Sequence, residues 1–85
     1  MERNEIVSKV TDILVEKLAV EPEEVTMETN IEKDLYADSI DFVEIITESE
    51  MAFRIEIKDN DAISVKTVND LVDVIEKEVN KEERS

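Results

Sequence analysis

Apolar residues recur at three- and four-residue spacing in three segments of the chain. This is the period of a helix with one apolar face, so we expect three helices. They cover roughly residues 4–18, with Asn4 as the expected cap, then Ser39 to Phe53, and finally Val68 to Asn80. The residues expected to face the core are Ile6, Val10, Ile13, Leu14 and Leu18 in the first helix, Val43, Ile46 and Phe53 in the second, and Val68, Leu71, Val72, Ile75 and Val79 in the third.

The segment between the first two predicted helices has no such period. Pro22 interrupts it, and we expect a connection of about 20 residues, which is longer than most loops of compact domains. Its isolated apolar residues are expected to hold it against the core, and they are Val20, Val25, Ile31 and Leu35.

The later segments predict shorter elements. Residues 54–59 alternate between apolar and polar but have no partner strand, so we expect an extended connection and then a short turn or helix near residues 59–63. Thr67 and Asp70 resemble a capping box at the start of the last helix. Residues 81–85 are expected to form a frayed tail.

These elements predict an all-α fold with a single domain over residues 1–80. It is a bundle of three main helices and one short helix, with a long loop between the first two. The chain has 85 residues, enough for one small core, and 41% of them are hydrophobic. Because there are only two Phe, one Tyr and no Trp, the core must be mostly aliphatic.

Charge and missing residue types narrow the function. The chain carries 24 acidic and 10 basic residues, a net charge of −14 that repels nucleic acid and attracts basic protein surfaces. It has no Cys and no His, which excludes thiolate nucleophiles, imidazole catalysis and the usual zinc sites. No apolar run approaches a membrane span and no signal peptide is visible, so we expect a soluble, cytoplasmic protein.

Glycine is also absent from the chain. Backbone positions that require a positive φ must then be taken by Asn or Asp, or be avoided. We expect Asn30 and Asn60 to serve as these substitutes, because both lie in predicted connections.

The stretch YADSIDFVEII, residues 36–46, places Ser39 between two aspartates at a predicted helix start. One interpretation is purely structural: Asp38 caps the helix, Asp41 favours its positive end, and Ser39 is a small first residue. The other is that Ser39 is a substrate for a modifying enzyme. It stands at an exposed helix end where free N–H groups favour an attached phosphate, in a chain without catalytic groups of its own.

Residues 34–41, DLYADSID, resemble the attachment motif D-L-G-x-D-S-L-D of the acyl carrier protein family. Six of the seven specified positions match if Ile is accepted for Leu. The resemblance covers roughly residues 4–80, and further matches are residues 23–26, 43–45, Phe53 with 55–57, and Thr67 with Val68.

The resemblance implies that Ser39 carries a covalent 4′-phosphopantetheine arm, transferred from coenzyme A by a magnesium-dependent holo-carrier-protein synthase. The thiol of this arm would supply the sulfur that the chain lacks, and growing fatty acyl chains would be carried on it as thioesters. The protein would therefore be a substrate of other enzymes, a carrier in fatty acid biosynthesis that catalyses nothing itself.

The family also implies a recognition surface. Asp38, Asp41 and Glu44 match acidic positions that meet basic patches on partner enzymes, and Glu48 and Glu50 would extend this surface more weakly. The implied partners are the phosphopantetheinyl transferase and the malonyl transferase, ketoacyl synthases, reductases and dehydratases of fatty acid synthesis. We expect a monomer that binds neither nucleic acid nor metal.

Four residues depart from the family pattern. Tyr36 replaces the usual Gly before the motif, Ala19 a Gly that often ends the first helix, and Lys58 a Pro. Ser49 stands at a position that is usually large and apolar. Ser49 either faces inward and leaves space or a polar lining in the interior, or it faces solvent while Met51 compensates.

The sequence is also compatible with functions other than a fatty acid carrier. A specialised carrier of a polyketide, aminoacyl or other dedicated pathway is the main alternative, and Tyr36 and Ser49 favour it slightly. An acidic helical adaptor without a prosthetic group would dock to basic partners without needing Ser39. An EF-hand beginning at Asp59 is disfavoured because Ile63 and Ser64 fall where an oxygen ligand and Gly are needed. A small bundle also offers little room for an enzyme cleft.

Overall fold

Five α-helices and one short 3₁₀ helix make up the fold in a computed structural model, which describes residues 1–84. The described part contains no β-strand, apart from an isolated bridge between Asn30 and Thr67. This confirms the predicted all-α fold. The elements are α1 (Arg3–Leu18), η1 (Pro22–Glu24), α2 (Ile31–Leu35), α3 (Ser39–Phe53), α4 (Asp59–Ser64) and α5 (Val68–Arg84).

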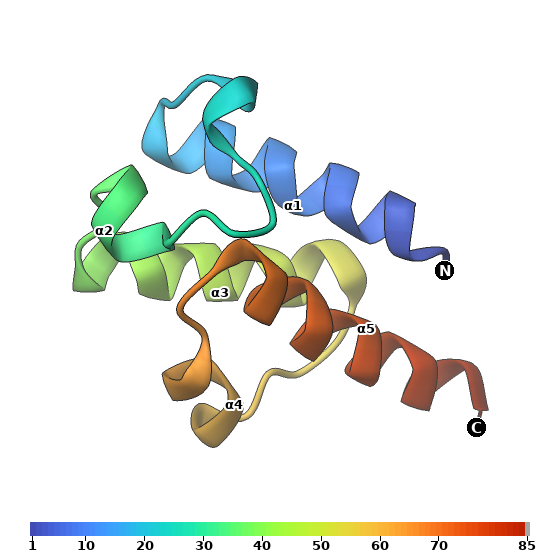
Figure 1. The fold of residues 1–85 in the computed structure, drawn as a ribbon. Helices are drawn as coiled ribbons and strands as arrows, with labels where there is room; N and C mark the ends of the chain where they lie inside the picture. Colours follow the sequence, from blue (N-terminus) through green and yellow to red (C-terminus); the bar gives the residue numbers. More distant parts are fainter. Residues whose placement is uncertain (85) are drawn as a thin grey trace.

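The three long helices surround the core. Helix α1 packs against both α3 and α5, and α3 also contacts α5 (Figure 1). The short helix α4 packs against α5, and α2 lies at the end of the bundle opposite to the two chain termini (Figure 1). Figure 1 shows that α3 begins at the α2 end, so the start of α3 lies far from both termini.

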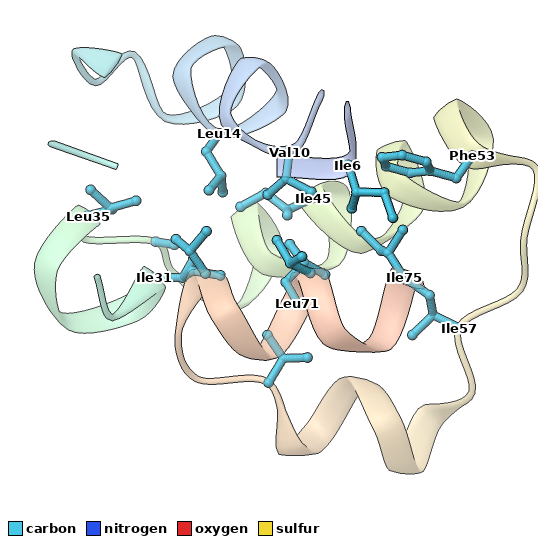
Figure 2. Close-up of a cluster of buried hydrophobic side chains, with 14 of the residues drawn as sticks. Ile6, Val10, Leu14, Ile31, Leu35, Ile45, Phe53, Ile57, Leu71 and Ile75 are labelled. Atoms are coloured by element: carbon cyan, nitrogen blue, oxygen red, sulfur yellow. The ribbon is translucent and has the colours of Figure 1, made fainter. Parts of the chain in front are cut away.

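The core is aliphatic, as the composition predicted, and it is built from one stripe of each long helix (Figure 2). A fully buried Leu, Ile or Val side chain stabilises a fold by roughly 1.5–3 kcal/mol. On α5 the predicted stripe is confirmed in full, because all five of its residues are buried. The buried apolar residues are Ile6, Val10 and Leu14 on α1, Ile45 and Phe53 on α3, Val68, Leu71, Val72, Ile75 and Val79 on α5, and Ile31, Leu35, Ala37, Ile57 and Val65 elsewhere.

On α3 the predicted core face was partly wrong. Val43 is 62% exposed, whereas Ile45 and Ser49 are fully buried. The hydroxyl of Ser49 donates a hydrogen bond to the carbonyl oxygen of Ile45 at 2.8 Å, which satisfies its polar group inside the core. Met51 is 68% exposed and does not compensate. Ser49 therefore faces inward, which is the first of the two alternatives.

The long connection between α1 and α3 contains helix α2, which the apolar pattern did not predict. Asn30 caps this helix by accepting a hydrogen bond from the Lys33 N–H at 2.8 Å, and Asp34 accepts one from the Asn30 N–H at 2.8 Å. Ile31 and Leu35 are buried, so their predicted anchoring role is confirmed. A helix of five residues is too short to show a period of its own.

Backbone hydrogen bonds tie this connection to the start of α5. We call this contact between residues 27–31 and 66–69 the backbone clasp. Each such bond contributes on the order of 1 kcal/mol and prevents a buried polar group from being left unpaired. The bonds run from Ile31 N to Lys66 O at 3.0 Å, from Val68 N to Thr29 O at 3.0 Å and from Asn69 N to Met27 O at 2.9 Å.

Three helices end in a left-handed residue, and none of these residues is Asn. They are Ala19 after α1 (φ 54°), Tyr36 after α2 (φ 60°) and Arg54 after α3 (φ 55°). Asn30 has φ −83° and serves as an N-cap, so its expected positive φ was wrong. A left-handed residue with a side chain costs about 1–2 kcal/mol relative to the right-handed form. The chain bears this cost at three helix ends because it has no glycine.

The helix starts were predicted with mixed success. Thr67 and Asp70 form the expected exchange at α5: the Asp70 N–H donates to the Thr67 hydroxyl at 3.1 Å, and the Thr67 N–H donates to the Asp70 carboxylate at 3.0 Å. The expected cap Asn4 was wrong, because α1 begins at Arg3 after Glu2 and Glu2 makes no side-chain cap bond. Helix α4, which begins after Lys58, also lacks a side-chain cap bond.

The last helix is longer than predicted. Residues 81–84, which we expected to lie beyond the helix, continue α5 to Arg84, and residue 85 lies outside the described residues. The fraying expected of residues 81–85 stays a prediction.

Replacing Ala19 with Gly is expected to raise the free energy of unfolding by about 1 kcal/mol, because Gly adopts the left-handed conformation without steric cost. Ala19 is exposed, so no packing is lost. Urea unfolding followed by circular dichroism measures the change. An A19G protein no more stable than the wild type would show that this helix end is not strained.

The Asp70 carboxylate should make stability depend on pH. Backbone N–H groups of Thr67 and Lys66 donate to it and lower the pKa of Asp70 below its ordinary value of 3.8. A lowered native pKa stabilises the fold fully above the unfolded pKa, and the contribution is lost as the pH falls from about 4 through the native pKa. We expect Asp70→Asn to lose stability at pH 7 and to lose less than the wild type on acidification. Parallel stability curves from pH 7 to pH 3 would contradict this.

Candidate functional site

The turn between α2 and α3 fixes the position of Ser39. The Tyr36 N–H donates to the carbonyl of Ile31, and the left-handed backbone of Tyr36 reverses the chain after α2. Ala37 is buried, and its N–H also faces the Ile31 carbonyl, at 3.4 Å. With one end of the turn held by α2 and its middle held in the core, Ser39 begins α3 at a defined place and is exposed there.

Two aspartates close the start of α3 around Ser39. The Asp41 N–H donates to the Asp38 carboxylate at 2.8 Å, and the Asp38 N–H donates back to the Asp41 carboxylate at 3.2 Å. This reciprocal exchange is a capping box, so the structural interpretation of both aspartates is confirmed. The Ser39 hydroxyl takes no part in it and has no hydrogen-bond partner among the described residues.

The acidic residues predicted for recognition fall into two groups. Asp38 and Glu44 are exposed and Asp41 is half-buried, and all three lie in the N-cap and first two turns of α3. The Glu44 carboxylate has no ion pair or hydrogen bond in the described part of the chain. These three residues form one acidic surface beside Ser39.

Glu48 and Glu50 are occupied by contacts within the fold. A Glu48 carboxylate oxygen lies 3.8 Å from the Lys17 ammonium on α1. The half-buried Glu50 carboxylate accepts a hydrogen bond from the Ile57 N–H at 2.8 Å and so holds the connection between α3 and α4. Their membership of the recognition surface stays a prediction, and Glu50 has a structural role that the sequence did not indicate.

Two hollows lie beside the start of α3, and the sequence did not predict either. One of about 540 Å³ opens between α2 and α4. A second of about 280 Å³ lies between α3 and α4, and Phe42 and Ala62 line both. Phe42, one helical turn after Ser39, lines the larger hollow, whereas Ser39 itself does not. The wall of this hollow is mixed: its apolar residues are Ile31, Phe42, Ala62, Ile63 and Val65, and its polar residues are Asn30, Glu32, Lys33 and Lys66.

The start of α3 fits a covalently attached phosphate ester. The Ser39 hydroxyl is exposed and free to form the ester. Unpaired N–H groups and the helix dipole at a helix start favour negative charge, and the N–H groups of Ser39 and Ile40 have no acceptor within the described residues. No buried group opposes attachment, because the side chains on both sides of Ser39 are exposed as well.

Within the described part of the chain, the acidic side chains do not gather into a metal site: no group of three or more His, Cys, Asp or Glu residues is placed there to hold a metal ion. In the segment weighed as an EF-hand, Asp61 pairs with the Lys77 ammonium at 3.4 Å and Asp70 caps α5. Across all the described residues, no helix has the length and hydropathy needed to cross a membrane.

Comparison with known protein families and sequences gives a consistent result. The family model described as "Phosphopantetheine attachment site" matches residues 8–75. The acyl carrier protein of Amoebophilus asiaticus is 51% identical over 74 residues, which are 87% of this chain and 92% of that protein. The acyl carrier protein of Porphyromonas gingivalis is 46% identical over 74 residues, covering 87% of this chain and 95% of the relative.

Solved structures agree with these relatives. The acyl carrier protein of Enterococcus faecalis, described for its high thermal stability, superposes with a TM-score of 0.78 at 40% identity and covers 92% of this chain and 99% of that one. The acyl carrier protein of Thermotoga maritima superposes with a TM-score of 0.82 at 30% identity and covers 96% of this chain and 95% of that one.

Proposed function

Because the chain belongs to the acyl carrier protein family, we propose that Ser39 is the residue that bears its phosphopantetheine. Members of this family are carriers rather than enzymes, and the group is attached covalently. The family match includes Ser39, and Ser39 is the one serine of the DSID motif. The observation that carries the proposal is its exposed, unpaired hydroxyl at the start of α3.

The protein's own part in this chemistry is to present the attached group to other enzymes and to shelter the acyl chain that the group carries. The attached group supplies a thiol, which the chain lacks, and acyl groups are carried on that thiol as thioesters. The capping box holds α3 closed around Ser39 without using the serine hydroxyl, so modification costs the helix no hydrogen bond. The larger hollow presents the apolar side chains of Phe42 and Ile63, against which a hydrocarbon chain would bury part of its surface.

The proposed cargo is the growing fatty acyl chain of fatty acid synthesis by separate enzymes, acting in the cytoplasm. The resemblance to free-standing acyl carrier proteins over 87% of the chain and the hollow lined in part by apolar side chains such as Phe42 support it. A specialised carrier is the second candidate, and the inward-facing Ser49 favours it because a small polar residue changes the interior that an acyl chain would meet. An adaptor without a prosthetic group is set aside, because the family bears one.

The proposed partners are the phosphopantetheinyl transferase and the enzymes that load, condense, reduce and dehydrate the carried acyl group. Asp38, Asp41 and Glu44 would meet basic residues of these enzymes. Attraction between opposite charges raises the rate of encounter and weakens with added salt. The net charge of −14 adds to this attraction over the whole surface.

The attachment site is tested by intact-mass measurement after incubation with coenzyme A, magnesium and a carrier-protein synthase. The wild type is expected to gain one phosphopantetheine and Ser39→Ala none. Ser8→Ala is the matched control, since Ser8 is also an exposed serine on a helix, and it should be modified like the wild type. A Ser39→Ala protein that still gains the group would move the site, and an unmodified wild type would refute the proposed function.

The acidic surface is tested at Glu44, because this carboxylate is exposed and supports no contact within the described fold. Asp41 is unsuitable, since its replacement would also break the capping box. We expect Glu44→Lys to raise the KM of the synthase for the carrier about three- to tenfold, roughly 0.6–1.4 kcal/mol, with the melting temperature unchanged.

The control for this prediction is Glu56→Lys, which makes the same charge change on an exposed residue beyond the far end of α3. The 15-residue helix separates the two ends by about 22 Å, more than a Debye length at physiological salt. The effect of Glu44→Lys should shrink as salt is added. Equal KM values for the two variants would show that net charge, and not this surface, guides the synthase.

A further inference from the structure

Tyr36 occupies a backbone position that suits Gly or Asn better. Its φ of 60° lies in the left-handed region, where a bulky side chain is unfavourable. Gly adopts this conformation without cost, and Asn tolerates it. The turn needs only the backbone of this residue, whose N–H donates to the Ile31 carbonyl.

The Tyr36 side chain contributes nothing to the fold that offsets this cost. The residue is 86% exposed, the largest value among the exposed large hydrophobic residues. Neither its ring nor its hydroxyl has a partner among the described residues. Ala19 and Arg54 share this backbone strain, so the feature that distinguishes Tyr36 is a large, exposed and unpartnered ring three residues before Ser39.

The ring nevertheless has a defined place. The turn that carries it is held by α2 on one side and by buried Ala37 on the other. Tyr36 precedes Ser39 by three residues, and Ile40, which is 72% exposed, follows Ser39 directly. Two bulky apolar side chains therefore flank the serine on the surface that any enzyme acting at Ser39 must approach.

The charges around the ring indicate what it binds. Asp34 and Asp38 are exposed, and each is two residues from Tyr36. One Asp34 oxygen accepts from the Asn30 N–H and one Asp38 oxygen accepts from the Asp41 N–H, which fixes both carboxylates and leaves each with an oxygen free. Exposed carboxylates two residues away in the sequence give the neighbourhood of the ring a negative charge, which suits a guanidinium that stacks on an aromatic face and pairs with an acid.

We propose that Tyr36 is a partner-contact residue that receives an arginine of the enzyme acting at Ser39. The inference rests on the proposed function, since it requires a protein that docks at this serine. It extends the acidic surface of Asp38, Asp41 and Glu44 backwards onto the turn before α3. The energetic cost of a tyrosine in a left-handed turn is then offset on binding and not in the free fold.

Four variants separate the side chain from the backbone. Tyr36→Gly should be more stable than the wild type, because strain is relieved, yet should raise the KM of the carrier-protein synthase about two- to fivefold with kcat little changed. Tyr36→Phe keeps the aromatic face and should match the wild type in KM. Tyr36→Leu keeps an apolar side chain without the aromatic face, and its KM should be raised like that of Tyr36→Gly.

Ala19→Gly is the matched control, because it relieves the same kind of strain at the end of another helix. It should gain stability with no change in KM. A Tyr36→Gly protein with wild-type KM would overturn the proposal, and Leu performing as well as Phe would overturn the arginine assignment. If the wild type itself gains no phosphopantetheine, the proposed function has failed, which is a different result from an unchanged KM.

The occupant of the ring is identified directly, since Tyr36 is the only tyrosine in the chain. Protein labelled with 3-fluorotyrosine should give a single ¹⁹F resonance. We expect this resonance to shift when the apo protein binds the synthase and to stay in place when the arm alone is attached. A shift on attachment of the arm would make the arm the occupant, and a shift with protein concentration would make it a second copy; either result would overturn the proposal.

Discussion

The position of Ser39 depends on the backbone clasp between residues 27–31 and 66–69. This contact brings the connection after α1 against the start of α5, and α2 begins within it, at Ile31. Helix α2 then leads through the buried Ala37 to the first residue of α3. Without the clasp, only the buried side chains of Ile31, Leu35 and Ala37 would hold α2 and Ser39 in place.

At the start of α3, the same residues serve folding and the proposed recognition of partner enzymes. Asp38 and Asp41 cap the helix, which ordinary helix chemistry explains in full, yet their carboxylates also form most of the acidic surface beside the serine. Because capping uses one oxygen of each carboxylate, the remaining charge still faces solvent. A substitution at either aspartate therefore removes a cap bond together with a charge of the acidic surface, whereas a substitution at Glu44 removes charge alone.

Because the chain has no glycine, other residues take the left-handed position at its helix ends. Ala19, Tyr36 and Arg54 all adopt this conformation, so the three ends can be compared by their side chains. At Ala19 the side chain is as small as a side chain can be. At Tyr36 it is large, exposed and close to Ser39, the proposed attachment residue, which distinguishes this turn from the other two.

Local sequence determined the three long helices, the capping boxes at Asp38 and Thr67, and the identity of Ser39 as the candidate site, because periodicity and capping act between residues a few positions apart. Only the tertiary structure decided the rest. It turned Ser49 inward and Val43 outward, because the face of α3 that is buried is the face that packs against α1 and α5. The apolar pattern of α3 alone does not identify that face, since several of its apolar residues are exposed. The tertiary structure also tied the start of α2 to Lys66, just before α5, occupied Glu50 with the Ile57 N–H, and opened the hollow beside Phe42. These features join residues that are distant in the sequence, so their physical cause is packing that no local pattern contains.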